Sequence, residues 1–140
     1  MNLSKQTKVV LALAGAATGT STLTTSTIDT SGYEGVMFVG SLATANAGNF
    51  AKARQGQQSN MSDGADLVNT KVVPANNGDS FLIDINRPQE RYVDLQIVRA
   101  GATTITGDVY AILYGPRKMP TSHGSTILAE THISPAEGTA

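Results

Sequence analysis

Residues 87–120 carry the clearest strand pattern in the chain and constrain the fold more than any other stretch. Apolar side chains occupy alternate positions in two runs, 92–98 and 109–114. The first run places three of them on one face: Val93, Leu95 and Ile97. The second run does the same with Val109, Ala111 and Leu113. Alternation with a period of two is typical of a strand with one buried face, so this stretch predicts two strands joined by a Gly/Thr-rich connection.

Similar patterns predict short strands elsewhere, at 8–14, 22–28, 36–42, 50–55, 81–85 and 126–133. Turn signals separate them, the strongest being Asn76-Asn77-Gly78-Asp79, since Asn and Gly tolerate positive φ. About eight or nine short strands with regular spacing favour an all-β chain. We therefore expect one domain over residues 1–140, an antiparallel β-sandwich of jelly-roll type with extended terminal arms.

Composition narrows the classes of function. Charged residues make up 15% of the 140 residues, against about 25% in typical soluble domains. The net charge of -1 offers no footprint for nucleic acid or an anionic membrane, so neither is expected as a partner. The absence of cysteine excludes disulfides and thiolate metal sites.

Residues 1–20 resemble a secretory signal, because two lysines precede a short apolar run and Ala14-Gly15-Ala16 resembles a cleavage site. The alternative is a strand over 8–14 or an N-terminal arm, and we expect the strand. The apolar run is in any case shorter than the roughly 20 residues that a membrane-spanning helix needs. Residues 134–140 are expected to form a C-terminal tail.

The search for chemistry finds no phosphate loop, dinucleotide fingerprint or hydrolase motif. His123, His132 and Glu130 suffice to draw a metal site, but a loop position and a strand position explain the two histidines more simply. Turn formation likewise explains two groups of oxygen ligands: Asp63 with Asp66, and Asn76, Asn77 and Asp79. We expect no catalytic residue, no cofactor and no bound metal, so the protein is not expected to be an enzyme.

Two charged turns remain. The first is a dense cluster of alternating charge: Arg87, Glu90, Arg91 and Asp94. The second is basic and lies between Pro116 and Pro120: Arg117 and Lys118. Each is either a solvated strand edge whose charges discourage unwanted pairing or a polar anchor for another chain, since Arg makes bidentate contacts.

These turns also carry a family resemblance. The runs RPQERYV and YGPRKMP, His123 and the terminal SPAEGTA resemble the C-terminal half of the capsid cement, or head-decoration, proteins of tailed bacteriophages, such as that of a Bordetella phage. The resemblance covers residues 71–140 best and is fainter for 32–40. Residues 1–31 match only in their apolar and Thr-rich character.

The resemblance implies a jelly-roll virion protein on the outer surface of a capsid built of HK97-like subunits. Such a protein binds the phage major capsid protein, stabilises contacts between capsomers, forms a homodimer or homotrimer and has no enzymatic activity. The positions it implies as structural or contact residues are Arg87, Pro88, Glu90, Arg91, Tyr92, Tyr114, Gly115, Pro116, Arg117 and Lys118.

Three other functions stay open. A glycan-binding or adhesive jelly roll would usually present aromatic platforms, whereas the chain has no Trp and four Tyr. A cupin-type enzyme would need two or three histidines clustered with a carboxylate on adjacent strands, and the chain has two histidines in all. A tail or neck component of the same particle is the third. For the cement function we further expect an arm, 1–17 or 134–140, to add a strand to a neighbouring chain.

Overall fold

A computed structural model describes residues 2–139, and their regular structure is almost entirely β. The elements in chain order are α1 (Leu3–Gln6), β1 (Thr7–Leu13), β2 (Ala16–Gly19), β3 (Leu23–Thr24), β4 (Ile28–Asp29), β5 (Gly35–Ser41), β6 (Asn49–Gly56), β7 (Ala65–Asp66), β8 (Ser80–Asn86), β9 (Tyr92–Arg99), β10 (Thr104–Thr106) and β11 (Val109–Tyr114). In this part of the chain no helix is long and apolar enough to cross a membrane.

The strands form two large sheets and a small ribbon. The first sheet, here sheet A, has the order β1-β11-β5-β8, and the second, sheet C, has the order β3-β9-β6-β7 with β4 also beside β9. Strands β10 and β2 form the ribbon, which is sheet B, and every pairing is antiparallel. The prediction of an all-β fold with antiparallel sheets is confirmed.

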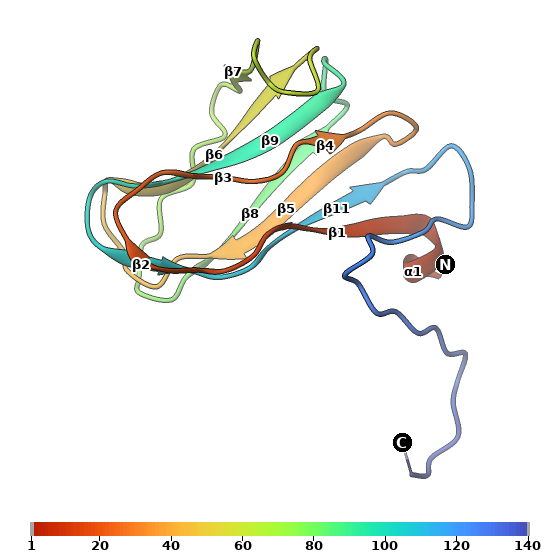
Figure 1. The fold of residues 1–140 in the computed structure, drawn as a ribbon. Helices are drawn as coiled ribbons and strands as arrows, with labels where there is room; N and C mark the ends of the chain where they lie inside the picture. Colours follow the sequence, from red (N-terminus) through yellow and green to blue (C-terminus); the bar gives the residue numbers. More distant parts are fainter. Residues whose placement is uncertain (1, 140) are drawn as a thin grey trace.

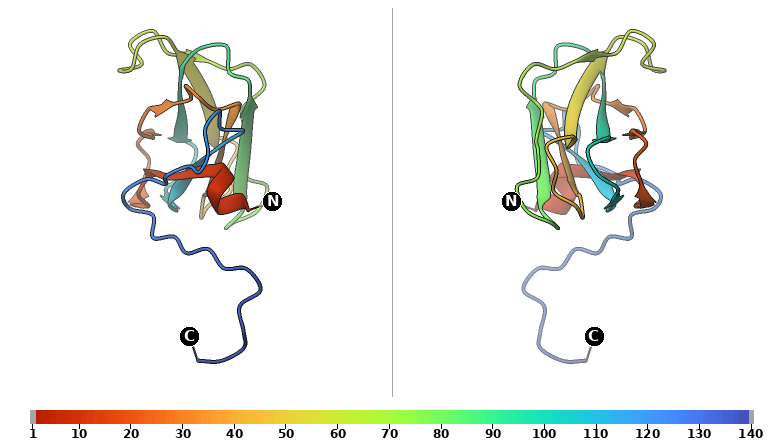
Figure 2. Two further views of the ribbon diagram at one scale, coloured as in Figure 1. Left: turned by 90° about the vertical axis from the view of Figure 1, so that its right-hand side faces the viewer. Right: turned by 90° about the vertical axis from the view of Figure 1, so that its left-hand side faces the viewer.

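Sheets A and C face one another as two layers and enclose the core (Figure 1; Figure 2). The alternating positions predicted to be buried in β9 and β11 do lie in this core, at 0–1% exposure. Large contributions from the other strands are Val36, Phe38, Phe81 and Ile83. The alternation therefore has a direct cause, because each strand turns one face to the opposite sheet.

The two strands of the opening stretch do not pair with each other. β9 lies in sheet C and β11 in sheet A, so their apolar faces meet across the core. The chain crosses between them through β10, and buried Arg99 secures this crossing. Its guanidinium donates to the carbonyl oxygens of Ser21, Ala17 and Thr104 at 2.9, 2.9 and 3.1 Å.

The strand expected at 8–14 is β1, and the strands expected at 36–42, 50–55 and 81–85 are β5, β6 and β8. The single strand expected at 22–28 is instead two short ones, β3 and β4, both paired with β9. Between them Thr25 interrupts the ladder, because its hydroxyl accepts from the Leu95 N–H at 3.0 Å. The short β7 lies in what was expected to be a plain loop at 60–70.

The strand predicted at 126–133 is wrong for this chain: these residues are irregular and mostly exposed. A strand needs a neighbour, and the preceding residues already line the free edge of β1, where Gly124 N–H donates to Val9 O at 2.8 Å. Beyond that point the chain leaves the sheets and extends away from them (Figure 1). Residues 134–139 of the expected tail are exposed. The N-terminal stretch considered as an arm instead contributes β1 to sheet A of its own chain. Residues 1 and 140 lie outside the described residues.

Candidate functional site

Three turns converge at one end of the two sheets (Figure 1). They are residues 30–34 between β4 and β5, residues 87–91 between β8 and β9, and residues 115–118 after β11. We call these residues the loop end. They surround an open hollow of about 680 Å³, so the structure brings the two turns singled out in the sequence to one place.

Glu34, which the sequence did not single out, joins the three turns through its backbone. Its N–H donates to the carbonyl oxygens of Tyr114 and Gly115 at 2.9 and 3.1 Å, and its own carbonyl accepts from Arg87 N–H at 2.8 Å. Gly115 has φ +61°, and a Cβ there would lie 2.5 Å from Glu34 Cβ. Glycine is therefore required at 115 by both backbone angle and space.

Arg91 is held by Asp29 rather than by the acidic residues near it in sequence. Its Nε and Nη2 donate to the two carboxylate oxygens of Asp29 at 2.9 and 2.8 Å. The guanidinium also lies 5.2 Å from the ring centroid of Tyr92. The grouping of Asp94 with this cluster was wrong, because strand alternation turns Asp94 onto the outer face of sheet C, where it pairs with Arg54.

The hydrogen bonds from Arg91 hold the pKa of Asp29 well below its usual range, against the opposing effect of desolvation. A carboxyl whose pKa is lower in the folded state stabilises the fold at pH values above its unfolded pKa of about 3.9. This stabilisation is lost as the pH falls from there toward the folded pKa. Below about pH 4, the free energy of unfolding of wild type should therefore decrease more steeply with falling pH than that of Asp29→Asn. Urea unfolding at neutral and acidic pH measures this, and equal slopes would exclude it. The difference should be small, since both side chains are about half exposed.

Arg87 combines a strained backbone with a nearly unbonded side chain. Its φ is +51°, its side chain is 80% exposed, and its ion pair with Glu34 is long at 3.5 Å. An exposed side chain at a left-handed position contributes little to folding. The exposed guanidinium is therefore a candidate for contact with another molecule.

Replacing Arg87 separates these roles. Arg87→Gly should raise the free energy of unfolding by about 0.5–1 kcal/mol, because glycine adopts positive φ without a Cβ clash. Arg87→Ala keeps the strain and should stay within about 0.5 kcal/mol of wild type. Chemical denaturation measures both. A glycine variant no more stable than the alanine variant would exclude the strain, and an alanine variant clearly less stable than wild type would show that the arginine side chain stabilises the fold.

The remaining predicted positions divide between the loop end and sheet A. Pro88 and Glu90 line the large hollow, while Pro116 and Lys118 line a smaller one of about 290 Å³. The Tyr114 hydroxyl lies on the outer face of sheet A and donates to Asp84 Oδ1 at 2.7 Å. Burial and this bond raise the pKa of the Tyr114 phenol.

The outer face of sheet A is apolar although it points away from the core. Cross-strand register places its side chains in two adjacent rows. One row is Leu11, Tyr110, Val39 and Leu82, and the next is Val9, Ile112, Met37 and Asp84. We call the seven apolar members the apolar outer face; Leu82 is 55% and Tyr110 37% exposed. A solvated antiparallel sheet would show polar residues here, so this face is a candidate for contact with another molecule.

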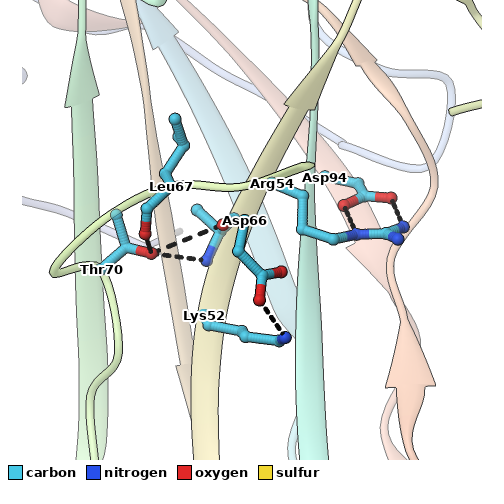
Figure 3. Close-up of polar contacts among 7 residues, drawn as sticks. Lys52, Arg54, Asp66, Leu67, Thr70 and Asp94 are labelled. Carbon is cyan, nitrogen blue, oxygen red and sulfur yellow. Dashed lines mark hydrogen bonds and ion pairs between the residues drawn. The ribbon is translucent and has the colours of Figure 1, made fainter. Parts of the chain in front are cut away.

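The outer face of sheet C carries more charged and polar side chains (Figure 3), although Phe50 and Val98 form one apolar pair there. Arg54 donates to both oxygens of Asp94, at 3.0 and 2.5 Å. Lys52 pairs with Asp66 at 2.6 Å, and the Thr70 hydroxyl donates to Leu67 O at 2.8 Å. The two outer faces thus differ in chemistry, and the apolar one is the better candidate for contact.

The groups considered as metal ligands serve local structure. His123 Nδ1 accepts from Val9 N–H at 3.0 Å, and His132 lies 3.0 Å from Glu130 on the exposed C-terminal segment. Asp63 accepts from the N–H groups of Gln57 and Gln58, and Asp79 from those of Ala75 and Asn76. Within residues 2–139 no three His, Asp or Glu side chains gather as a metal site would need.

The loop end carries the exposed Arg87 side chain, and the apolar outer face carries the exposed side chains of Leu82 and Tyr110. Both offer side chains suited to contact between proteins. Comparison of the chain with protein-family models, with curated proteins and with solved structures finds no match.

Proposed function

We propose that this protein is a non-enzymatic structural component of a tailed-phage virion. It binds the outer surface of a capsid built of HK97-like subunits and cements contacts between capsomers. The resemblance of residues 71–140 to cement proteins supports the identity of the partner. The surfaces of the molecule support the kind of activity.

The strand pairing supports the jelly-roll part of this proposal. The pairs are nested along the chain: β1 with β11, β3 and β4 with β9, β5 with β8, and β6 with β7. Winding such a ribbon brings β11 beside β5 and β9 beside β6, and both contacts are present. This is the winding expected of a jelly roll, a double sheet with two Greek keys.

The apolar outer face is the observation that carries the proposal. Burying a fully exposed apolar side chain stabilises a contact by about 1.5–3 kcal/mol, and the gain per side chain is smaller here because five of the seven are already partly buried. Polar residues border the face, with the Ser41 and Ser80 pair on one side and Tyr114 with Asp84 on the other. An apolar centre within a polar border is the usual anatomy of a protein interface. Modest contacts of this kind hold firmly when they are repeated over a shell.

The loop end provides the second part of the contact. Its exposed Arg87 is strained in its own fold, and arginine is well suited to bind carboxylates on a partner. The loop end adjoins sheet A through Glu34 and Tyr114, so one partner surface can meet both. In this contact the apolar outer face supplies affinity, and Arg87 fixes the orientation of the protein on the capsid.

Sedimentation with phage heads tests the proposal. Heads of the source particle, stripped of their outer proteins, should capture the purified protein to saturation at a fixed number of copies per shell. Unassembled capsid subunits serve as a control for binding that needs the shell. Failure of the folded protein to sediment with stripped heads would overturn the proposal.

A further inference from the structure

Residues 126–133 have a strand-like sequence but no strand in their own chain. Their side chains alternate in extended form, with Ile127, Ala129, Thr131 and Ile133 on one face and Leu128 on the other. The segment extends from the body (Figure 2), and Leu128 and Ile133 are 98% and 89% exposed. Among the hydrogen bonds of residues 2–139, one joins 128–139 to the rest of the chain, between Thr131 and Ser4 at 2.5 Å.

Strand β8 is an open edge of sheet A that can accept a strand. Its one ladder partner is β5. The bonds that flank the ladder, Leu42 N–H to Asp79 O and Arg87 N–H to Glu34 O, show that the odd-numbered residues of β8 point their backbone groups at β5. The N–H and C=O groups of Leu82 and Asp84 therefore point away from the sheet. An edge of this length is a template for a further strand.

A hollow of about 530 Å³ runs beside this edge. It lies between β8 and residues 66–70, and its apolar lining includes Leu67, Val68 and Ile85. Val68 is 86% exposed. A strand added to β8 would turn one face toward this hollow and its other face toward the side of Leu82.

Residues 126–133 cannot pair with the open edge of β8 in their own chain. Residue 124 lies outside β1, and β1 and β8 are opposite edges of sheet A. Reaching the outer side of β8 crosses five strand spacings, about 24 Å. Residues 124 to 126 span at most about 7 Å. A strand over 126–133 therefore needs the β8 edge of another copy.

We propose that residues 126–133 of one copy pair with β8 of a second copy as the fifth strand of its sheet A. The face that carries Ile127 and Ile133 turns toward the side of the hollow lined by Leu67 and Val68, and Leu128 extends the apolar outer face next to Leu82. Main-chain hydrogen bonds give affinity, and the apolar surfaces on the two sides of β8 determine which face of the added strand turns to each side. The contact involves no capsid subunit, so it is tested apart from shell binding.

Sedimentation analysis of the full chain across a dilution series tests the donor strand. Wild type should form a concentration-dependent oligomer. The double variant Ala129→Pro/Glu130→Pro should sediment as one chain, because consecutive strand residues point their N–H groups in opposite directions and one of the two must be lost from the pairing. Its matched control, Ala129→Ser/Glu130→Gln, keeps both N–H groups and should oligomerise as wild type does.

The acceptor edge is tested with Leu82→Pro and Leu82→Ala. Both remove the side chain, but proline also removes the outward N–H, so the proline variant alone should be a single chain. If Leu82→Pro fails to fold, amide exchange of Leu82 and Asp84 in wild type decides. It should be at least about tenfold slower than in the double-proline donor variant. A wild type that stays a single chain, an oligomer that survives donor proline substitution, or equal exchange at both amides would overturn the proposal.

Discussion

Replacing Arg54 with alanine is expected to lower the free energy of unfolding by about 3–5 kcal/mol. The reason is the environment of its partner, since the Asp94 side chain is 2% exposed and accepts two hydrogen bonds from Arg54 (Figure 3). Without Arg54 a charged carboxylate stays buried and uncompensated, or it must be protonated. Either outcome opposes folding.

Lys52→Ala is the matched control for this variant. Lys52 lies on the same strand and the same face, but its ion pair with Asp66 is 25% and 54% exposed. Its loss should lower stability by less than about 1 kcal/mol. Urea denaturation of both variants measures the difference. Equal losses would show that Asp94 is not buried behind Arg54.

Replacing Tyr110 with aspartate is expected to weaken binding to stripped phage heads by at least about 100-fold while the protein stays folded. Tyr110 lies in the apolar outer face and is 37% exposed, so the charge is solvated in the free protein. In a closed interface the same charge would lose water without gaining a partner. Binding isotherms on heads give the change, and circular dichroism confirms the fold.

Gln96→Asp is the control for Tyr110→Asp. Gln96 projects from β9 between Thr24 and Lys52 on the outer face of sheet C, so the same charge enters a polar surface. This variant should bind heads as wild type does. If it loses binding and Tyr110→Asp does not, sheet C rather than sheet A faces the shell.

The long strands are predictable from local pattern because each has one face in the core. The buried positions of β9, Val93, Leu95 and Ile97, follow from alternation alone. The same alternation in β11 also revealed an outer face with Tyr110 and Ile112, which proved to belong to a wider apolar surface. That surface depends on which strands are neighbours, and a single strand does not contain this information.

Pairing partners at the loop end are not predictable from spacing. Arg91 and Asp94 are near neighbours in sequence but on different surfaces, while the carboxylate that binds Arg91 is 62 residues away at Asp29. Glu34 gave one signal, its place between Gly32 and Gly35 in a turn. Apart from the long ion pair with Arg87, its contacts with Tyr114, Gly115 and Arg87 are backbone bonds, and backbone bonds leave no mark on side-chain composition.

Residues 126–133 show the opposite case, in which the local pattern predicts a strand and the chain has none. Strand formation needs a partner edge, and within one chain the nearest edge is already lined by residues 121–124. The alternating pattern is nevertheless suited to pairing. Under the proposed pairing with β8 of a second copy, this pattern reports a contact made between copies rather than within one.

Cryo-electron microscopy of the decorated particle is the most direct test that this protein is a capsid cement. Density for the protein should lie on the outside of the shell at junctions between capsomers, with the apolar outer face of sheet A and Arg87 against capsid subunits. A particle with the protein in the tail or neck, or with that face open to solvent on the shell, would contradict the proposal.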